Sequence, residues 1–163
     1  MGGCNVNRMT DLLGLAAVAV MATPGLVASQ ENGSPPSPAI GDVTAGEALY
    51  GEYCASCHGV NLEGQPDWRS PGEDGRLPAP PHDDKGHTWH HADSMLFNYT
   101  KLGGTEFLAI QGLDFDSGMP AFGEDLGDED IWNILAFIKS TWPERIRQIQ
   151  AERTEFDNQR QGN

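Results

Sequence analysis

The residues of this chain best suited to chemistry are two cysteines and a histidine in the run Cys54-Ala55-Ser56-Cys57-His58. Two thiols at this spacing can form thioether bonds to the two vinyl groups of one porphyrin, and the imidazole that follows is then held under the iron as its proximal ligand. A redox Cys-x-x-Cys pair needs no histidine after it. A zinc site would need further ligands at matching spacing, which the sequence lacks. The run therefore predicts one covalently attached c-type haem.

The iron of such a haem needs a ligand on its far side, and the sequence favours Met119. This residue lies far downstream of His58, between a glycine and a proline, with no apolar period around it. A thioether on a restrained loop can approach the iron from the side opposite His58, whereas Met95 lies on an apolar helix face and fits ordinary packing. Four histidines compete for the same position, but they follow His58 too closely for a chain that must first pass around the haem edge: His82, His87, His90 and His91.

The same histidine-rich segment, residues 82–91, has a second interpretation of its own. Its imidazoles, together with nearby aspartates, could hold a second metal ion such as copper or zinc, or could form a pH-sensitive patch. The alternative is that they donate hydrogen bonds to haem propionates and cap the loop backbone. His90 and His91 are adjacent, so on a regular element they cannot face the same ion. This favours hydrogen bonding to propionates and the loop backbone over a metal site.

Residues 1–29 are typical of a secretory signal peptide. An apolar stretch from Leu12 to Ala22 is too short to span a bilayer, which needs about 20 apolar residues, and small residues follow near Ser29. Export agrees with thioether attachment, which in bacteria takes place after the chain has crossed the membrane. We therefore expect a periplasmic protein with no stable membrane span after cleavage. Arg8 is the only basic residue before the apolar stretch, so an uncleaved anchor is the alternative.

The charge of the chain bears on its partners. The formal net charge is −14, which argues against nucleic acid and against anionic membrane surfaces. It favours redox partner proteins with basic docking patches, met in brief encounters that salt weakens. The alternative is that the acidity only keeps an exported protein soluble.

Ahead of the haem motif, the sequence predicts a linker and one helix. Residues 30–42 are rich in proline, serine and glycine and have no apolar period, as in a flexible linker. A helix is expected over residues 44–55, with Thr44 as its N-cap and Glu47 completing a capping box.

After the motif, long loops alternate with helices. Residues 59–91 are expected to form a long loop. Such a loop is tolerable here because it can wrap around an apolar porphyrin. A short helix over residues 93–102, capped by Asp93, ends at a Gly-Gly pair. A second loop covers residues 112–127, and a strong helix with an acidic first turn follows it. Pro143 interrupts that helix.

The C-terminal tail, residues 143–163, is polar and prone to form a helix. Ile146 and Ile149 lie at helical spacing among charged and amide side chains. We expect a solvated helix that rests lightly on the domain, with a helix that docks a partner as the alternative.

Taken together, residues 43–142 resemble monohaem class I cytochromes c. The resemblance rests on a helix with Gly46 and Tyr50, then Cys-Ala-Ser-Cys-His-Gly, then Gly-Met-Pro-Ala-Phe, and then an acidic start to a helix rich in Ile, Trp, Leu and Phe. Four further runs are similar to a proteobacterial subgroup that has a His-rich Gly-His-Thr-Trp-His-His loop: residues 61–69, 78–83, 86–91 and 139–143.

The resemblance implies an all-α fold in which the N- and C-terminal helices of the domain cross around a covalently bound haem and the loops are long. It implies that Gly46 and Tyr50 meet the face that carries Trp132 and Ala136, because glycine allows close approach.

The resemblance also implies two contacts around the cofactor. A proline carbonyl within residues 78–81, for which we select Pro80, would accept a hydrogen bond from Nδ1 of His58 and so orient its ring. An aromatic N–H, assigned to Trp89, would bond a haem propionate.

These expectations converge on periplasmic electron transfer by one c-type haem with His58/Met119 ligation. No group is placed for bond-making chemistry, so the chain is expected to be a carrier rather than an enzyme, although it could be the electron-accepting subunit of an oxidoreductase. Two alternatives stay open. One is a copper-handling protein that uses the His-rich loop, and the other is a haem gas sensor in which Met119 leaves the iron.

Overall fold

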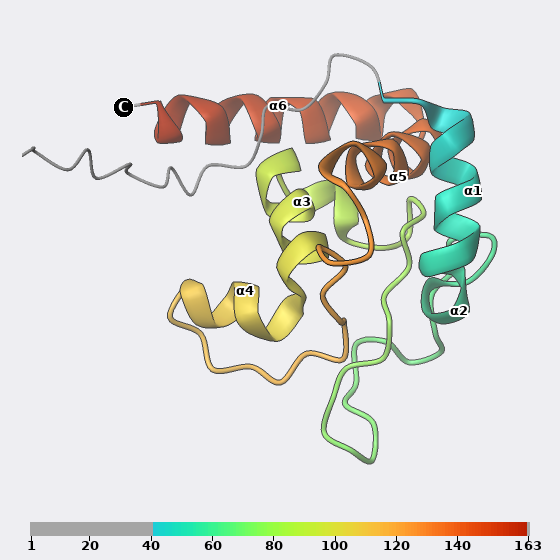
Figure 1. Ribbon diagram of the computed structural model, residues 1–163, viewed down its shortest axis with the longest axis vertical. Helices are drawn as coiled ribbons and strands as arrows, with labels where there is room; N and C mark the ends of the chain where they lie inside the picture. The colour runs from blue at the N-terminus through green and yellow to red at the C-terminus, as the bar shows by residue number, and fades with distance from the viewer. Residues whose placement is uncertain (1–40, 163) are drawn as a thin grey trace, which may run out of the picture. The chain divides into compact units, whose positions relative to one another are not determined.

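A computed structural model describes residues 41–162, and this part of the chain contains helices and loops but no strand (Figure 1). It confirms the all-α fold. The expected signal peptide, residues 1–29, and nearly all of the expected linker, residues 30–42, lie outside the described residues. The helices, including one short 3-10 helix, η1, are α1 (Val43–Tyr53), α2 (Ala55–His58), η1 (Thr88–His90), α3 (Asp93–Leu102), α4 (Gly104–Ile110), α5 (Asp128–Ser140) and α6 (Glu144–Gln161).

Helix α1 crosses α5 at a glycine, and the two helices lie side by side in Figure 1. A Cβ atom at Gly46 would lie 1.9 Å from the backbone oxygen of Asn133 and 3.0 Å from the Cβ atom of Phe137. Only glycine lets the two backbones approach this closely. One turn further on, the ring of Tyr50 packs against Phe137, with ring centroids 5.4 Å apart.

The residues of α5 at this crossing differ from the expected pair. The atoms nearest to a Cβ atom at Gly46 belong to Asn133 and Phe137. A Cβ atom at Gly41, just ahead of α1, would meet the backbone oxygen of Trp132 and the Cβ atom of Ala136. The ring of Trp132 instead stacks on Phe97 of α3, with centroids 4.5 Å apart. A helix turns by about 100° per residue, so an error of one position moves a contact to a neighbouring face.

The N-caps of α1 and α3 also differ from the expected ones. The carboxylate of Asp42, rather than Thr44, caps α1, and it accepts hydrogen bonds from the backbone N–H groups of Thr44 and Ala45. Helix α3 has Ala92 at its N-cap position, without a side-chain cap, because the carboxylate of Asp93 is turned into the interior.

Helix α4 was not expected from the sequence. Gly103 ends α3 with φ +78°, a left-handed conformation that glycine adopts readily, and the chain starts a new helix at Gly104. The predicted end of α3 is therefore correct, but the same Gly-Gly pair also begins α4. The core forms where α1, α3 and α5 meet, and its most buried large side chains are Tyr50, Phe97, Ile131, Ile134 and Trp142.

Helix α6 begins directly after Pro143 and is bound to the domain more firmly than expected. Gln150 is 0 % exposed, and its amide nitrogen donates to the backbone oxygen of His91 and to the carboxylate of Asp93. Lys139 of α5 donates to both oxygens of the same carboxylate at 2.8 Å. A buried polar network thus joins α6 to α3 and α5. None of the helices within residues 41–162 is long and apolar enough to cross a membrane.

Candidate functional site

The two cysteines of the motif lie at the two ends of one helical turn. Cys54 precedes α2 and is buried, whereas Cys57 within α2 is exposed, and neither forms a disulfide. Burial, and then repulsion by Cys57, raises the pKa of the Cys54 thiol to about 11, so it stays protonated near neutral pH. The pair offers two sulfur atoms of different exposure, one toward the interior and one at the surface.

His58 closes the same turn and is 7 % exposed. Its Nδ1 lies 2.8 Å from the backbone oxygen of Pro80. A carbonyl oxygen can only accept, so Nδ1 carries the proton and Nε2 is left with a free lone pair. Burial lowers the pKa of His58 and keeps the imidazole neutral. A neutral ring that is oriented through its other nitrogen is the form that ligates a metal.

The loop that carries Pro80 is fastened to the segment directly after His58. The backbone N–H of Gln65 donates to the oxygen of Ala79 at 2.8 Å, and the Gln65 side chain accepts from the N–H of Ala79 at 3.2 Å. Gly64 has φ +69°, and a Cβ atom there would lie 2.4 Å from the backbone nitrogen of Pro81. The residue types alone did not predict this pairing of Gln65 with Ala79. The glycine before Gln65 was its only local sign in the sequence.

His82, two residues after Pro80, packs against the ring of His58. The two imidazole rings are 4.0 Å apart between centroids and tilted by 34°. Nδ1 of His82 lies 2.9 Å from the hydroxyl of Thr88, and burial lowers the pKa of His82 well below its usual value. His82 therefore packs beside the expected proximal ligand.

The loop that contains Met119 is fixed at the junction of α3 and α4. The N–H of Gly104 donates to the oxygen of Met119 at 3.0 Å, and the N–H of Met119 donates to the hydroxyl of Ser117 at 3.2 Å. That hydroxyl also lies 3.0 Å from the hydroxyl of Tyr99. Met119 is half-buried. Within residues 41–162, no hydrogen bond joins Met119 to His58. His58 ends α2, whereas Met119 lies in the loop between α4 and α5.

Trp89, on η1, carries an unsatisfied buried donor. Its indole N–H is buried and meets no acceptor among the described residues, and the same holds for Trp132. A buried N–H without an acceptor costs about 1–3 kcal/mol. A propionate group of a porphyrin is an acceptor that could satisfy such a donor, so this feature fits the expected cofactor. The donor of Trp132 was not expected from the sequence.

The other three histidines pack against rings instead of converging on one point. The ring of His87 stacks on Trp68 at 5.2 Å between centroids, and that of His90 stacks on Trp89 at 3.6 Å. His91 meets His87 edge to face. Among residues 41–162, no group of three or more His, Cys, Asp or Glu side chains is arranged to hold a metal ion. The geometry therefore lends no support to a copper site in this loop.

Comparison with known families decides the identity. The family model for cytochrome c matches residues 43–142, which is more than half of the chain. The chain belongs to the cytochrome c family. Its all-α structure is consistent with the class I fold, and the family carries a covalently bound haem c. No curated protein and no solved structure matched the chain.

Membership gives the general activity of this cytochrome c, which is haem-based electron transfer with redox proteins as partners. Members of the family are typically electron carriers rather than enzymes. The donor set fits a haem: two thiols one helical turn apart, a buried neutral imidazole with one free nitrogen, and a buried indole N–H that lacks an acceptor.

Proposed function

We propose that this cytochrome c is a periplasmic electron carrier, with its haem attached to Cys54 and Cys57 and its iron bound by His58 and Met119. The observation that supports this most strongly is the 2.8 Å hydrogen bond from Nδ1 of the buried His58 to Pro80. It leaves Nε2 as the only ring nitrogen able to bind a metal, and it raises the basicity of that nitrogen.

When bound, the haem supplies one iron that accepts and releases a single electron. The residues around the haem limit how far the chain would have to move when that electron is gained or lost. Pro80 and the ring of His82 hold the imidazole of His58 in one orientation, and the backbone bond from Gly104 holds the loop of Met119. With both His58 and Met119 bound, the iron would have no position left for water or substrate. A thioether ligand also favours the reduced state over a second imidazole.

Transfer to a partner would take place where the cofactor comes near the surface. Cys57 is exposed while Cys54 is buried, so the proposed thioether edge lies at the boundary between the interior and solvent. The net charge of −14 favours partners with basic docking patches. The periplasmic location rests on the signal-like residues 1–29, and sequencing the N-terminus of the mature protein tests it.

The test of ligation is the near-infrared spectrum of the ferric holoprotein matured in a periplasm. A weak sulfur-to-iron charge-transfer band is expected in the wild type and is expected to be lost in Met119→Ala. Met95→Ala is the matched control, because Met95 lies on α3 and is half-buried like Met119. A wild type without the band, or a Met119→Ala protein that retains it, would remove Met119 from the iron. In that case a histidine from residues 82–91 would bind the iron instead, or the position would be open, as in a gas sensor.

A further inference from the structure

Helix α4 and the loop that follows it expose a concentrated apolar surface. Ile110, Leu113 and Phe115 are 64 %, 56 % and 41 % exposed, and all three lie within a run of six residues. Single exposed apolar side chains are ordinary, but a group of them next to polar residues marks an interaction site. We call residues 104–116 the α4 surface.

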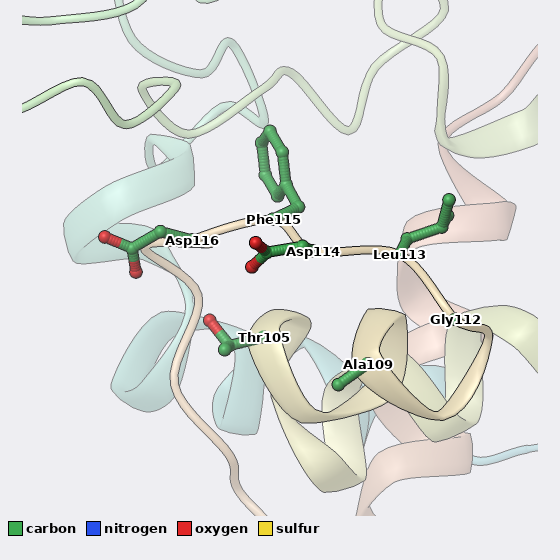
Figure 2. A pocket seen from close by; sticks show the side chains of 7 residues that line it. All are labelled: Thr105, Ala109, Gly112, Leu113, Asp114, Phe115 and Asp116. Atoms are coloured by element: carbon green, nitrogen blue, oxygen red, sulfur yellow. The ribbon is translucent and has the colours of Figure 1, made fainter.

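A cleft of about 350 Å³ lies in this surface (Figure 2). Thr105 and Ala109 of α4 form one side, and the loop bearing Leu113, Asp114 and Asp116 forms the other. The cleft thus combines an apolar wall with two carboxylates. A lysine or arginine side chain has the matching chemistry, because its stem packs on apolar groups while its charged end seeks carboxylate oxygens.

The two carboxylates differ in their availability. Asp116 already accepts a hydrogen bond at 2.9 Å from Arg76, which lies on the loop after the haem motif. Asp114 forms no salt bridge with any residue of the described range 41–162. An incoming cation would therefore meet Asp114 first.

The α4 surface is joined directly to the Met119 loop. The hydroxyl of Thr105 accepts from the N–H of Ser117 at 3.0 Å, and the N–H of Gly104 donates to the oxygen of Met119 at 3.0 Å. A partner seated on this surface would therefore rest against the segment proposed to carry the sixth ligand.

We propose that the α4 surface is a docking surface for a redox protein that inserts a lysine or arginine from a basic patch into this cleft. The proposal rests on the proposed function as an electron carrier, and it assigns that function a binding face. Charge decides between occupants. A second copy of a chain with net charge −14 would be repelled, and so would nucleic acid or an anionic membrane.

The test measures electron transfer between the purified holoprotein and a basic c-type cytochrome with lysines around its haem edge, followed by stopped flow over a range of ionic strength. Asp114→Lys reverses one charge in the cleft. Glu152→Lys makes the same change in net charge on an exposed position of α6 and is the matched control. We expect Asp114→Lys to lower the second-order rate constant about threefold or more relative to Glu152→Lys at low salt, with the difference lost at high salt.

Leu113→Ser tests the apolar wall without changing charge, and we expect it also to slow the reaction. Amide shifts of the labelled holoprotein with a tetralysine peptide should cluster within residues 104–116. Equal rates for the two charge variants, or amide shifts that leave residues 104–116 unchanged, would overturn the docking surface. Reversible redox titration of the same samples separates the two proposals, because a wild type that does not cycle reversibly would contradict the carrier function itself.

Discussion

The imidazole of His82 packs against that of His58, with ring centroids 4.0 Å apart. His58 is therefore held in two ways, through its nitrogen by the carbonyl of Pro80 and through its ring face by His82. Tyr50 of α1 lies edge to face with His82 at 6.1 Å, so the ring pair is also connected to the helix crossing. The orientation of the proposed proximal ligand thus depends on the core of the fold as well as on the motif.

Replacing His82 should separate its packing role from its hydrogen bond to Thr88. His82→Ala removes a half-buried ring beside His58, and we expect it to lower the free energy of unfolding of the holoprotein by about 2 kcal/mol. It should also change the rhombicity of the ferric electron paramagnetic resonance spectrum, because the His58 ring can then rotate. His82→Phe keeps a ring beside His58 and should change both quantities less. Equal effects of the two substitutions would argue against the packing role.

The two glycines of α1 should respond to alanine in opposite directions. A Cβ atom at Gly46 would lie 1.9 Å from the backbone oxygen of Asn133, so Gly46→Ala must push α1 away from α5. We expect it to lower the free energy of unfolding by about 2–4 kcal/mol. A Cβ atom at Gly51 meets nothing within 4 Å, and Gly51→Ala should raise stability by about 0.5–1 kcal/mol. Denaturant unfolding of both holoproteins checks the pair, and a stable Gly46→Ala protein would contradict the close crossing.

What the sequence could predict was local. The helices α1, α3 and α5 follow from residues a few positions apart and were predicted to within a few residues, whereas α4 was missed. The cap of α1 could not be assigned in this way, because Asp42 and Thr44 are both good caps. Asn133, 91 residues away, accepts the N–H of Asp42 at 2.8 Å and fixes the chain so that Asp42 caps the helix. The burial of Gln150 likewise depends on His91, a partner 59 residues away.

This account of the cap leads to a direct comparison. Asp42→Ala removes the acceptor of two backbone N–H groups at the start of α1, and it should lower the free energy of unfolding by about 1 kcal/mol. Thr44→Ala changes an exposed residue inside the helix and should have little effect. Thermal or denaturant unfolding of the two variants side by side provides the measurement, and a larger loss for Thr44→Ala would restore the cap expected from the sequence.

The bond between Lys139 and Asp93 should matter far more than a surface pair. Asp93 is buried and accepts from both Lys139 and Gln150, so Lys139→Met leaves a buried carboxylate without its counter-charge. We expect a loss of about 2–4 kcal/mol in the free energy of unfolding, together with faster amide exchange in α6. Lys85→Met breaks only a 4.0 Å pair whose lysine is 83 % exposed, and it should change stability by less than about 0.5 kcal/mol. Similar losses for both variants would contradict the proposed role of the network.

The last prediction concerns acid stability and His91. Burial, and then the positive charges possible on His87, His90 and Arg153, lowers the pKa of His91 from 6.5 to about 4. As the pH falls from about 6.5 toward 4, the unfolded chain takes up a proton at this position while the folded chain does not, so folding stability is lost across that range. Because the side chain is partly exposed, the loss should be about 1 kcal/mol.

His91→Gln should remove that part of the pH dependence. Its free energy of unfolding should fall less than that of the wild type between about pH 7 and about pH 4.5, measured by denaturant titration of the holoprotein at each pH. A proton magnetic resonance titration of the wild-type His91 ring supplies the direct check, with a midpoint expected near 4. A midpoint near 6.5, or a variant that loses as much stability as the wild type, would show that the loop beneath α6 is open to water.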